Sequence, residues 1–240
     1  MKLDILAIGA HPDDIELSCS GTLMKQIDFG NKVGIIDLTK GELGTRGSAE
    51  IRLQEVEAAT KVMGIHAREN LGFEDGFFKD DKEHQLELVK MIRKYQPRIV
   101  IGNAKHDRHP DHGRAAELTF NACFLAGLNK IETKLDGELQ KPFRPLALYH
   151  YIQSLDAQPD FVIDISAFFE RKLKAVGAYK SQFHHAEAKT DEPQTFISSP
   201  EFIEFLKARA IHYGMPVGMK YAEAFVTNRT LGVNNIMDLI

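Results

Sequence analysis

The sequence predicts an α/β protein with a Rossmann-like, mostly parallel sheet that is covered by helices on both faces. Three observations support this fold class: short apolar runs without polar alternation, helical segments between these runs, and short connections. A run such as Leu3–Ala10 is typical of a strand that is buried on both faces. Strands that alternate with helices in this way form a parallel sheet.

The expected elements have local signals at their ends. Gly30 and Gly64 are suited to helix C-termini, Pro97 breaks a helix, and Ser166 is a candidate N-cap. The expected strands are Leu3–Ala10, Val33–Leu38, Arg68–Leu71, Arg98–Gly102, Leu146–Ile152, Phe161–Ile165 and Tyr221–Val226. The expected helices are Gly21–Phe29, Ala49–Met63, His84–Tyr95, Asp111–Leu125, Ser166–Tyr179 and Pro200–His212.

The chain shows no internal repeat, low-complexity segment or Pro/Gly-rich linker, although the alternation loosens after Gly127. We therefore expect residues 1–240 to form a single domain. Residues 1–127 would form its Rossmann-like core, and residues 128–240 would complete the fold and shape a pocket.

The composition excludes several classes of protein. The formal net charge of −4 argues against a nucleic-acid or anionic-membrane partner, because such partners favour a basic face. We find no apolar run near the roughly 20 residues of a membrane span and no signal-peptide pattern, so a cytoplasmic protein is expected. Cys19 and Cys123 lie in apolar surroundings and are interpreted as buried hydrophobic residues.

Two polar clusters follow predicted strands. His11-Pro12-Asp13-Asp14 comes directly after Leu3–Ala10, and His109-Pro110-Asp111-His112 comes soon after Arg98–Gly102. Ligands of parallel sheets bind beyond the carboxyl ends of the strands, so both clusters would face one crevice within the 1–127 core. Imidazole and carboxylate are good zinc ligands, and three of them with one open position are typical of a catalytic site.

Each cluster alone also fits a capped helix start, with Asp13 or Asp14 near the first turn or Pro110 at the first helical position. Together they favour a metal site. A nucleotide-binding oxidoreductase is disfavoured, because no G-x-G-x-x-G follows the first strand. A non-enzymatic binding module is disfavoured because it needs no spare acid and base. His184 and His185 fit a solvated pair or, alternatively, a substrate contact.

The two clusters, with Gly21-Thr22 and the segment from Thr39 to Gly47, resemble the PIG-L/LmbE-like family of zinc-dependent N-acetylglucosaminyl deacetylases. The resemblance covers at least residues 3–125. Within the family the chain is most similar to the bacillithiol-pathway branch, which deacetylates N-acetylglucosaminyl-malate. Its length, Asp107-Arg108 and the segment from Gly177 to Phe183 carry this finer resemblance. Relatives are often homo-oligomers, including hexamers, which implies the same here.

The resemblance implies one zinc ion per chain, with His11, Asp14 and His112 as its ligands; Fe²⁺ remains an alternative for such a ligand set. It also implies a general base, Asp13, and a second catalytic histidine, His109. A protonated His109 would stabilise the oxyanion or donate a proton to the amine.

Further residues are assigned by resemblance and by chemistry. Asp111 would orient His109 and favour its cationic form, as a nearby carboxylate does. Glu42, Arg52 and Asp75 correspond to sugar contacts in relatives, and Arg108 is a candidate partner for malate. Solvated positions are the alternative for Glu42 and Arg52. A metalloamidase acting on another N-acyl substrate remains an open alternative.

Overall fold

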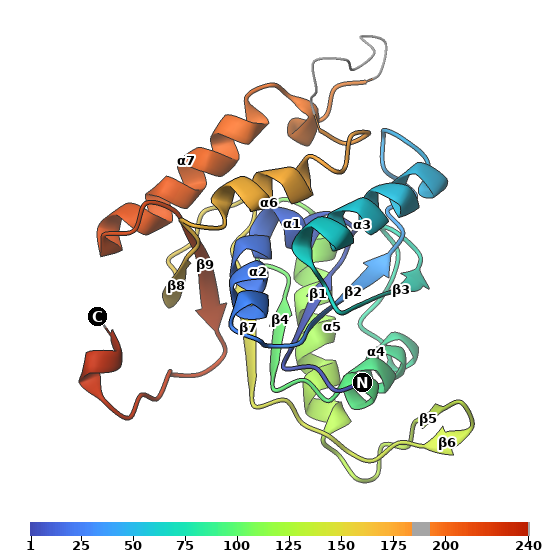
Figure 1. Cartoon of the computed structure of the whole chain (residues 1–240). Helices are drawn as coiled ribbons and strands as arrows, with labels where there is room; N and C mark the ends of the chain where they lie inside the picture. Colours follow the sequence, from blue (N-terminus) through green and yellow to red (C-terminus); the bar gives the residue numbers. More distant parts are fainter. Residues whose placement is uncertain (184–192, 240) are drawn as a thin grey trace.

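A seven-stranded sheet lies at the centre of the protein in the computed structural model, which describes residues 1–183 and 193–239 (Figure 1). The strand order is β3-β2-β1-β4-β7-β9-β8. The strands from β3 to β7 pair in parallel, and β9 runs antiparallel to both β7 and β8. The strands are β1 Ile5–Gly9, β2 Val33–Thr39, β3 Ala67–Phe73, β4 Ile99–Gly102, β7 Ala147–Tyr151, β8 Phe161–Asp164 and β9 Ala222–Thr227.

Helices cover both faces of this sheet, as predicted (Figure 1). Leu6 and Ile8 of β1 belong to a core cluster with α4 and α5, whereas Ile5 and Ala7 pack toward α2 and α6 on the other face. The apolar run therefore reflects burial of alternate side chains on opposite faces. The helices are α1 Asp14–Ser18, α2 Ser20–Asp28, α3 Ala49–Met63, α4 Lys82–Tyr95, α5 Pro110–Ala126, α6 Phe169–Val176 and α7 Phe202–Gly214.

All seven predicted strands and all six predicted helices are present, with small shifts at their ends. The N-cap prediction for Ser166 is wrong. Helix α6 begins at Phe169, and its N-cap is Phe168. The Ser166 hydroxyl instead donates to the Asp164 carboxylate at 2.6 Å, and the Ser166 N–H donates to the same oxygen at 2.9 Å. Both donor groups of Ser166 therefore bind Asp164, and neither caps α6.

Short elements were missed because they carry no periodic signal. All five residues of α1 are buried, including the polar ones, so this helix lacks the solvent-exposed face that gives an amphipathic pattern in the sequence. The other missed elements are the hairpin strands β5 Lys134–Leu135 and β6 Glu138–Leu139 and the 3₁₀ helices η1 Phe196–Ser198, η2 Met215–Val217 and η3 Ile236–Leu239.

Two expectations from composition can be compared with the described structure. Cys19 and Cys123 are buried free thiols, which confirms their interpretation as small core residues. Within residues 1–183 and 193–239, none of the helices combines the length and the apolarity required to cross a membrane.

The buried carboxylate of Glu223 in β9 forms an ion pair with α6 and hydrogen bonds with the start of α2. Lys172 Nζ lies 2.5 Å from Glu223 Oε1, and both side chains are less than 5% exposed. The Glu223 carboxylate also accepts hydrogen bonds from the N–H groups of Gly21 (3.0 Å) and Thr22 (2.7 Å) at the start of α2. One carboxylate therefore holds α2, α6 and β9 together.

Replacing Glu223 with alanine should lower the free energy of unfolding by about 3–5 kcal/mol, because the buried Lys172 ammonium loses its counter-charge. Urea denaturation followed by circular dichroism measures this change. Lys90→Ala is the matched control, since Lys90 and Glu87 form a partly exposed pair that should contribute less than about 1 kcal/mol. Equal effects of the two substitutions would contradict the prediction.

Candidate active site

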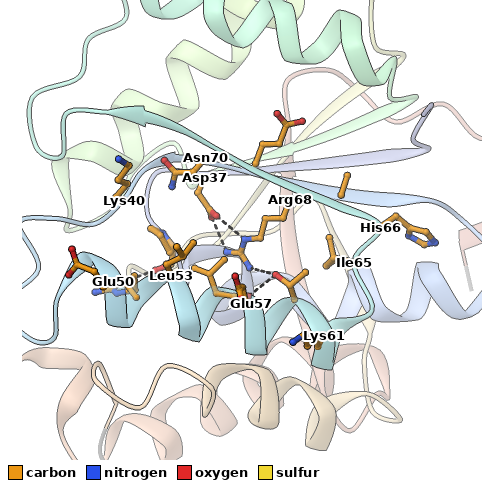
Figure 2. A pocket seen from close by; sticks show the side chains of 16 residues that line it. Asp37, Lys40, Glu50, Leu53, Glu57, Lys61, Ile65, His66, Arg68 and Asn70 are labelled. Atoms are coloured by element: carbon orange, nitrogen blue, oxygen red, sulfur yellow. Dashed lines mark hydrogen bonds and ion pairs between the residues drawn. The ribbon is translucent and has the colours of Figure 1, made fainter.

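One cavity, of about 640 Å³, lies between α3 and the strands β2 and β3 (Figure 2). The Arg68 guanidinium donates to both oxygens of Asp37, at 2.8 and 3.0 Å, and to Glu16 at 2.6 Å. All three nitrogens of the Arg68 guanidinium are therefore engaged by carboxylates of the protein itself. The described lining contains one histidine, His66, and no group of side chains arranged to hold a metal.

A smaller cavity, of about 350 Å³, is lined by residues that the sequence analysis singled out. Its lining includes His11 and Asp14 from the first cluster and His109 and His112 from the second. Arg52 lines both cavities and forms part of the wall between them. We therefore assign the candidate active site to the smaller cavity.

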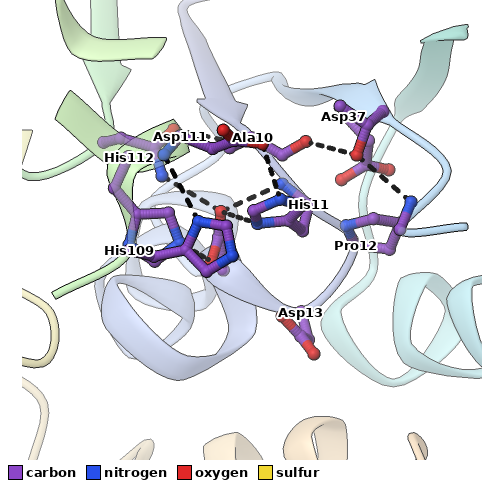
Figure 3. A network of polar contacts seen from close by, with 12 residues as sticks. Ala10, His11, Pro12, Asp13, Asp37, His109, Asp111 and His112 are labelled. Carbon is purple, nitrogen blue, oxygen red and sulfur yellow. Dashed lines mark hydrogen bonds and ion pairs between the residues drawn. The ribbon is translucent and has the colours of Figure 1, made fainter. Parts of the chain in front are cut away.

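The sheet topology explains why the two clusters meet. Strands β1 and β4 are parallel neighbours, so the chain leaves both at the same edge. The ring centroids of His11 and His112 are 5.5 Å apart, and His109 lies 4.7 Å from His11 and 5.1 Å from His112 (Figure 3). The structure thus brings together side chains that are about a hundred residues apart in sequence.

Asp14 lies between the two proposed histidine ligands. Its carboxylate is 3.6 Å from His11 Nδ1 and 3.1 Å from His112 Nε2. The outer nitrogen of each ring is held by carboxylates: His112 Nδ1 lies 2.7 Å from Asp107, and His11 Nε2 lies 3.0 Å from Asp75. Such carboxylates orient the imidazoles of metal sites and fix their tautomers.

The charges of the site favour a cation. Burial alone would lower the pKa of each histidine, but contacts with Asp111, Asp14 and Asp75 raise the pKa of His11 well above its usual value. Asp14 and Asp107 raise the pKa of His112 to about 9. A divalent metal can replace protons that carboxylates hold on imidazoles, so the donor set fits a metal ion.

Two triplets in the described part of the chain have ligand atoms that all lie within 4.8 Å of one another: His11, His109 and His112, and His11, Asp75 and Asp111. The predicted set of His11, Asp14 and His112 is not one of them, but the first triplet shares both of its histidines. The carboxylates of the second triplet already have other donors. Asp75 accepts from the Leu43 N–H at 3.0 Å, and Asp111 accepts from the Gly76 N–H at 2.9 Å and from Arg114 at 2.8 Å. Both carboxylates also contact His11 Nε2, at 3.0 and 3.3 Å, where they can orient this ring.

Asp13 has a strained backbone and a buried carboxyl group. Its φ of 107° lies in the left-handed region, which non-glycine residues rarely adopt and which is common at functional sites. Burial raises the pKa of its carboxyl to about 7, although the neighbouring Arg52 guanidinium opposes this shift. A carboxyl with this pKa is suited to accept and return a proton near neutral pH.

The structure changes the expected relationship between Asp111 and His109. The Asp111 carboxylate contacts His11 at 3.3 Å, while the Asp111 backbone N–H donates to His109 Nδ1 at 3.3 Å. Burial and the two neighbouring histidines lower the pKa of His109, so the expected cationic form is not favoured. Because Nδ1 accepts, the proton of the neutral ring resides on Nε2.

The four predicted substrate contacts have different surroundings. Arg52 Nη1 donates to the Pro12 carbonyl at 2.9 Å and to Asp13 at 3.3 Å, and Asp75 is held by His11. Glu42 is exposed, accepts from the Asp75 N–H at 2.9 Å and is not among the residues that line the cavity. Arg108 lines the cavity, with its guanidinium 4.8 Å from the Phe196 ring centroid.

Sequence reasoning missed one wall of the cavity and several polar residues, among them Asp107. The wall is aromatic and contains Phe196, Phe202 and Phe205. Its only signal in the sequence is the density of phenylalanine in this segment. Asp107 stands beside the second cluster in the sequence, but its contact with His112 was not predicted. His184 and His185 lie outside the described residues.

Comparison with known proteins identifies the family. A family model described as GlcNAc-PI de-N-acetylase (PIG-L) matches residues 6–123. The chain is 30% identical over 230 residues to the diacetylchitobiose deacetylase of Thermococcus kodakarensis, a match that covers 91% of this chain and 80% of that protein. The chain belongs to the PIG-L family. The resemblance inferred from the two clusters is thereby confirmed.

Two more matches of this PIG-L protein extend over most of its length. It is 26% identical over 214 residues to a probable N-acetyl-alpha-D-glucosaminyl L-malate deacetylase 2 of Bacillus cereus, covering 81% of this chain and 93% of that protein. The structure of the conserved protein TT1542 from Thermus thermophilus has 39% identity and a TM-score of 0.84, covering 97% of this chain and 98% of that one. Residues beyond the family model therefore belong to the same fold.

His150 behind the site gives the PIG-L protein a defined pH dependence of stability. Burial lowers its pKa to about 4, whereas the unfolded value is about 6.5. Below pH 6.5 the unfolded chain protonates His150 and the folded chain does not, so this residue contributes a loss of up to about 3 kcal/mol of stability as the pH falls to about 4. The raised pKa of Asp13 contributes in the opposite direction over the same range, so the His150 contribution is measured as a difference from a variant. Chemical denaturation at several pH values measures this slope.

In His150→Gln, the slope of the unfolding free energy against pH should be lower than in the unaltered protein by about 1.4 kcal/mol per pH unit between about pH 4 and pH 6.5, because the titrating group is gone. An unchanged slope would show that His150 is not neutral in the folded protein.

Proposed function

We propose that this PIG-L protein is a zinc-dependent deacetylase that hydrolyses the N-acetyl group of an N-acetylglucosamine conjugate. The observation that carries the proposal is the contact of one carboxylate, Asp14, with both His11 and His112 in a cavity that also contains Asp13 and His109. Three ligands beside a spare carboxyl and a spare imidazole are what amide hydrolysis by a metal site requires. The deacetylase names of two relatives support the same reaction.

The proposed ligands are His11, Asp14 and His112. When bound, zinc supplies Lewis acidity that polarises a carbonyl group and makes water more acidic. The donor set of two imidazoles and one carboxylate suits zinc, and Fe²⁺ is the alternative that metal analysis distinguishes.

Asp13 is proposed as the general base. Its carboxylate takes a proton from the attacking water while the water oxygen forms a bond to the acetyl carbon. When the bond from that carbon to the sugar nitrogen breaks, the same carboxyl group returns the proton to the leaving amine. The products are acetate and the free amine. Arg52 holds the Asp13 carboxylate in place through its 3.3 Å contact.

His109 is proposed to stabilise the developing oxyanion as a neutral donor. Its Nδ1 accepts the Asp111 N–H, which leaves the Nε2–H group to donate. Arg108, Asp75 and Arg52 are proposed to contact the sugar or the group attached to it, and Glu42 to support the loop that carries Asp75.

The proposed substrate is N-acetylglucosaminyl-malate, as in bacillithiol biosynthesis. The match to the Bacillus cereus relative over 93% of that protein supports it, and the exposed Arg108 guanidinium at the cavity suits a carboxylate. We further propose that the chain forms one domain, acts in the cytoplasm and assembles as a homo-oligomer such as a hexamer.

Acetate release from N-acetylglucosaminyl-malate, diacetylchitobiose and N-acetylglucosamine should be measured with the zinc-loaded protein. The malate conjugate should be hydrolysed with a kcat/KM at least about tenfold higher than the neutral sugars, since one charge-assisted contact is worth about 1.5–3 kcal/mol. Equal rates would overturn the malate proposal. Release from an unrelated N-acyl amide alone would favour the metalloamidase alternative.

Asp13→Asn should lower kcat by about a hundredfold or more, since asparagine cannot accept the proton, while zinc remains bound. His112→Ala should instead lose zinc, because it removes a ligand. Metal content by mass spectrometry and kcat for acetate release check both variants. Full turnover by Asp13→Asn, or stoichiometric zinc in His112→Ala, would contradict these roles.

A further inference from the structure

Two buried carboxamides from different strand ends hold the proposed ligand Asp14. Asn103 follows β4, and its Nδ2 donates to Asp14 Oδ2 at 3.0 Å. Gln153 follows β7, and its Nε2 donates to Asp14 Oδ1 at 2.7 Å. Their exposed fractions are 0% and 4%. Each carboxylate oxygen therefore has its own donor, which fixes the plane of the carboxylate.

The orientation of the Asn103 amide is determined by its surroundings. Its Oδ1 accepts the N–H of Ala10 at 2.9 Å, so the amide nitrogen must face Asp14. The reversed amide would place an oxygen against the carboxylate and an N–H against an N–H. The Asn103 backbone carbonyl in turn accepts from His150 Nδ1 at 2.8 Å.

The loop after β7 contacts Asp14 directly and His112 through Asp107. The Gln153 side chain contacts Asp14, and the next N–H, of Ser154, donates at 3.3 Å to Asp107, which holds His112. Arg209 of α7 fixes this loop by donating to the Gln153 carbonyl and, at 2.7 Å, to the Leu17 carbonyl of α1. Helix α7 is thereby connected to the site.

The chemistry of these donors suits a metal ligand. A lysine or arginine beside Asp14 would neutralise the carboxylate and repel a divalent cation. A carboxamide instead satisfies a lone pair and leaves the full negative charge for the metal. The two amides thus combine a fixed geometry with an undiminished charge.

We propose that Asn103 and Gln153 are positioning residues that set the orientation of Asp14 for metal binding. Through Gln153, the orientation of Asp14 depends on the positions of β7 and α7. This inference rests on the ligand set of the proposed function, and it concerns metal affinity independently of the substrate. Partners that orient ligands in this way contribute about 10–100-fold to metal affinity.

The test uses Gln153→Met, which keeps the length of the side chain and removes the donor. Zinc dissociation constants are measured by competition with a chelator, and the visible absorption spectrum of the Co²⁺-loaded protein reports the ligand geometry. The variant should bind zinc about 10–100-fold more weakly and show an altered Co²⁺ spectrum. Gln140→Met is the control, because the Gln140 amide donates to the Lys90 carbonyl away from the site.

Thermal unfolding of the metal-free proteins separates positioning from folding, since Gln153→Met should unfold close to Gln140→Met. If Gln153→Met does not fold, Gln153→Asn gives the same test, because it keeps the amide but withdraws the donor by one methylene. A zinc affinity and Co²⁺ spectrum equal to those of the unaltered protein would overturn the inference. If the unaltered protein binds zinc but releases no acetate from N-acetylated sugars, only the proposed function is contradicted. If the unaltered protein binds neither zinc nor Co²⁺, both the proposed function and this inference are overturned.

Discussion

The candidate site depends on the placement of a single carboxylate between two histidines. Asp14 can meet His11 because both lie in the turn after β1, and it can meet His112 because β4 is the parallel neighbour of β1. The carboxylate is almost completely buried. Burial alone would raise its pKa, but the two histidines hold it well below the usual value. The anion is therefore stable only with cationic partners.

Around this carboxylate the cavity has two chemically different sides. The polar side carries the histidines and Asp13, and the other side is formed by phenylalanines of η1 and α7. A sugar has hydroxyl groups at its edge and C–H groups on its faces, so a cavity of this kind can bind both parts of a glycoside. The strained backbone of Asp13 places its carboxyl group on the polar side, where Arg52 restrains it.

The sequence predicted the scaffold and most of the polar side chains that line the candidate site, because both have local signals. Apolar runs predict buried strands, and the clusters that begin at His11 and His109 directly follow two of them. Partners contributed by distant segments could not be predicted. Gln153 reaches the site through the register of β7 and has no distinctive neighbour in sequence, whereas Asp107 stands beside the second cluster but its contact with His112 depends on how the turn before α5 folds. The contact of Asp111 with His11 instead of His109 depends on side-chain directions that spacing alone does not determine.

The order of these residues along the chain affects how the site can form during synthesis. A nascent chain that ends near Gly127 already contains His11, Asp14 and His112, but it lacks Gln153, Ser154 and Arg209. The proposed ligands thus leave the ribosome with Asn103 and Asp107, but before Gln153 and the loop that carries it. Domains generally fold from the N-terminus as they are made, so a metal ion captured early would meet a loosely ordered set of donors. If His11, Asp14 and His112 bind a metal as proposed, the Gln153 contact with Asp14 would be added only once β7 and the loop after it have been made.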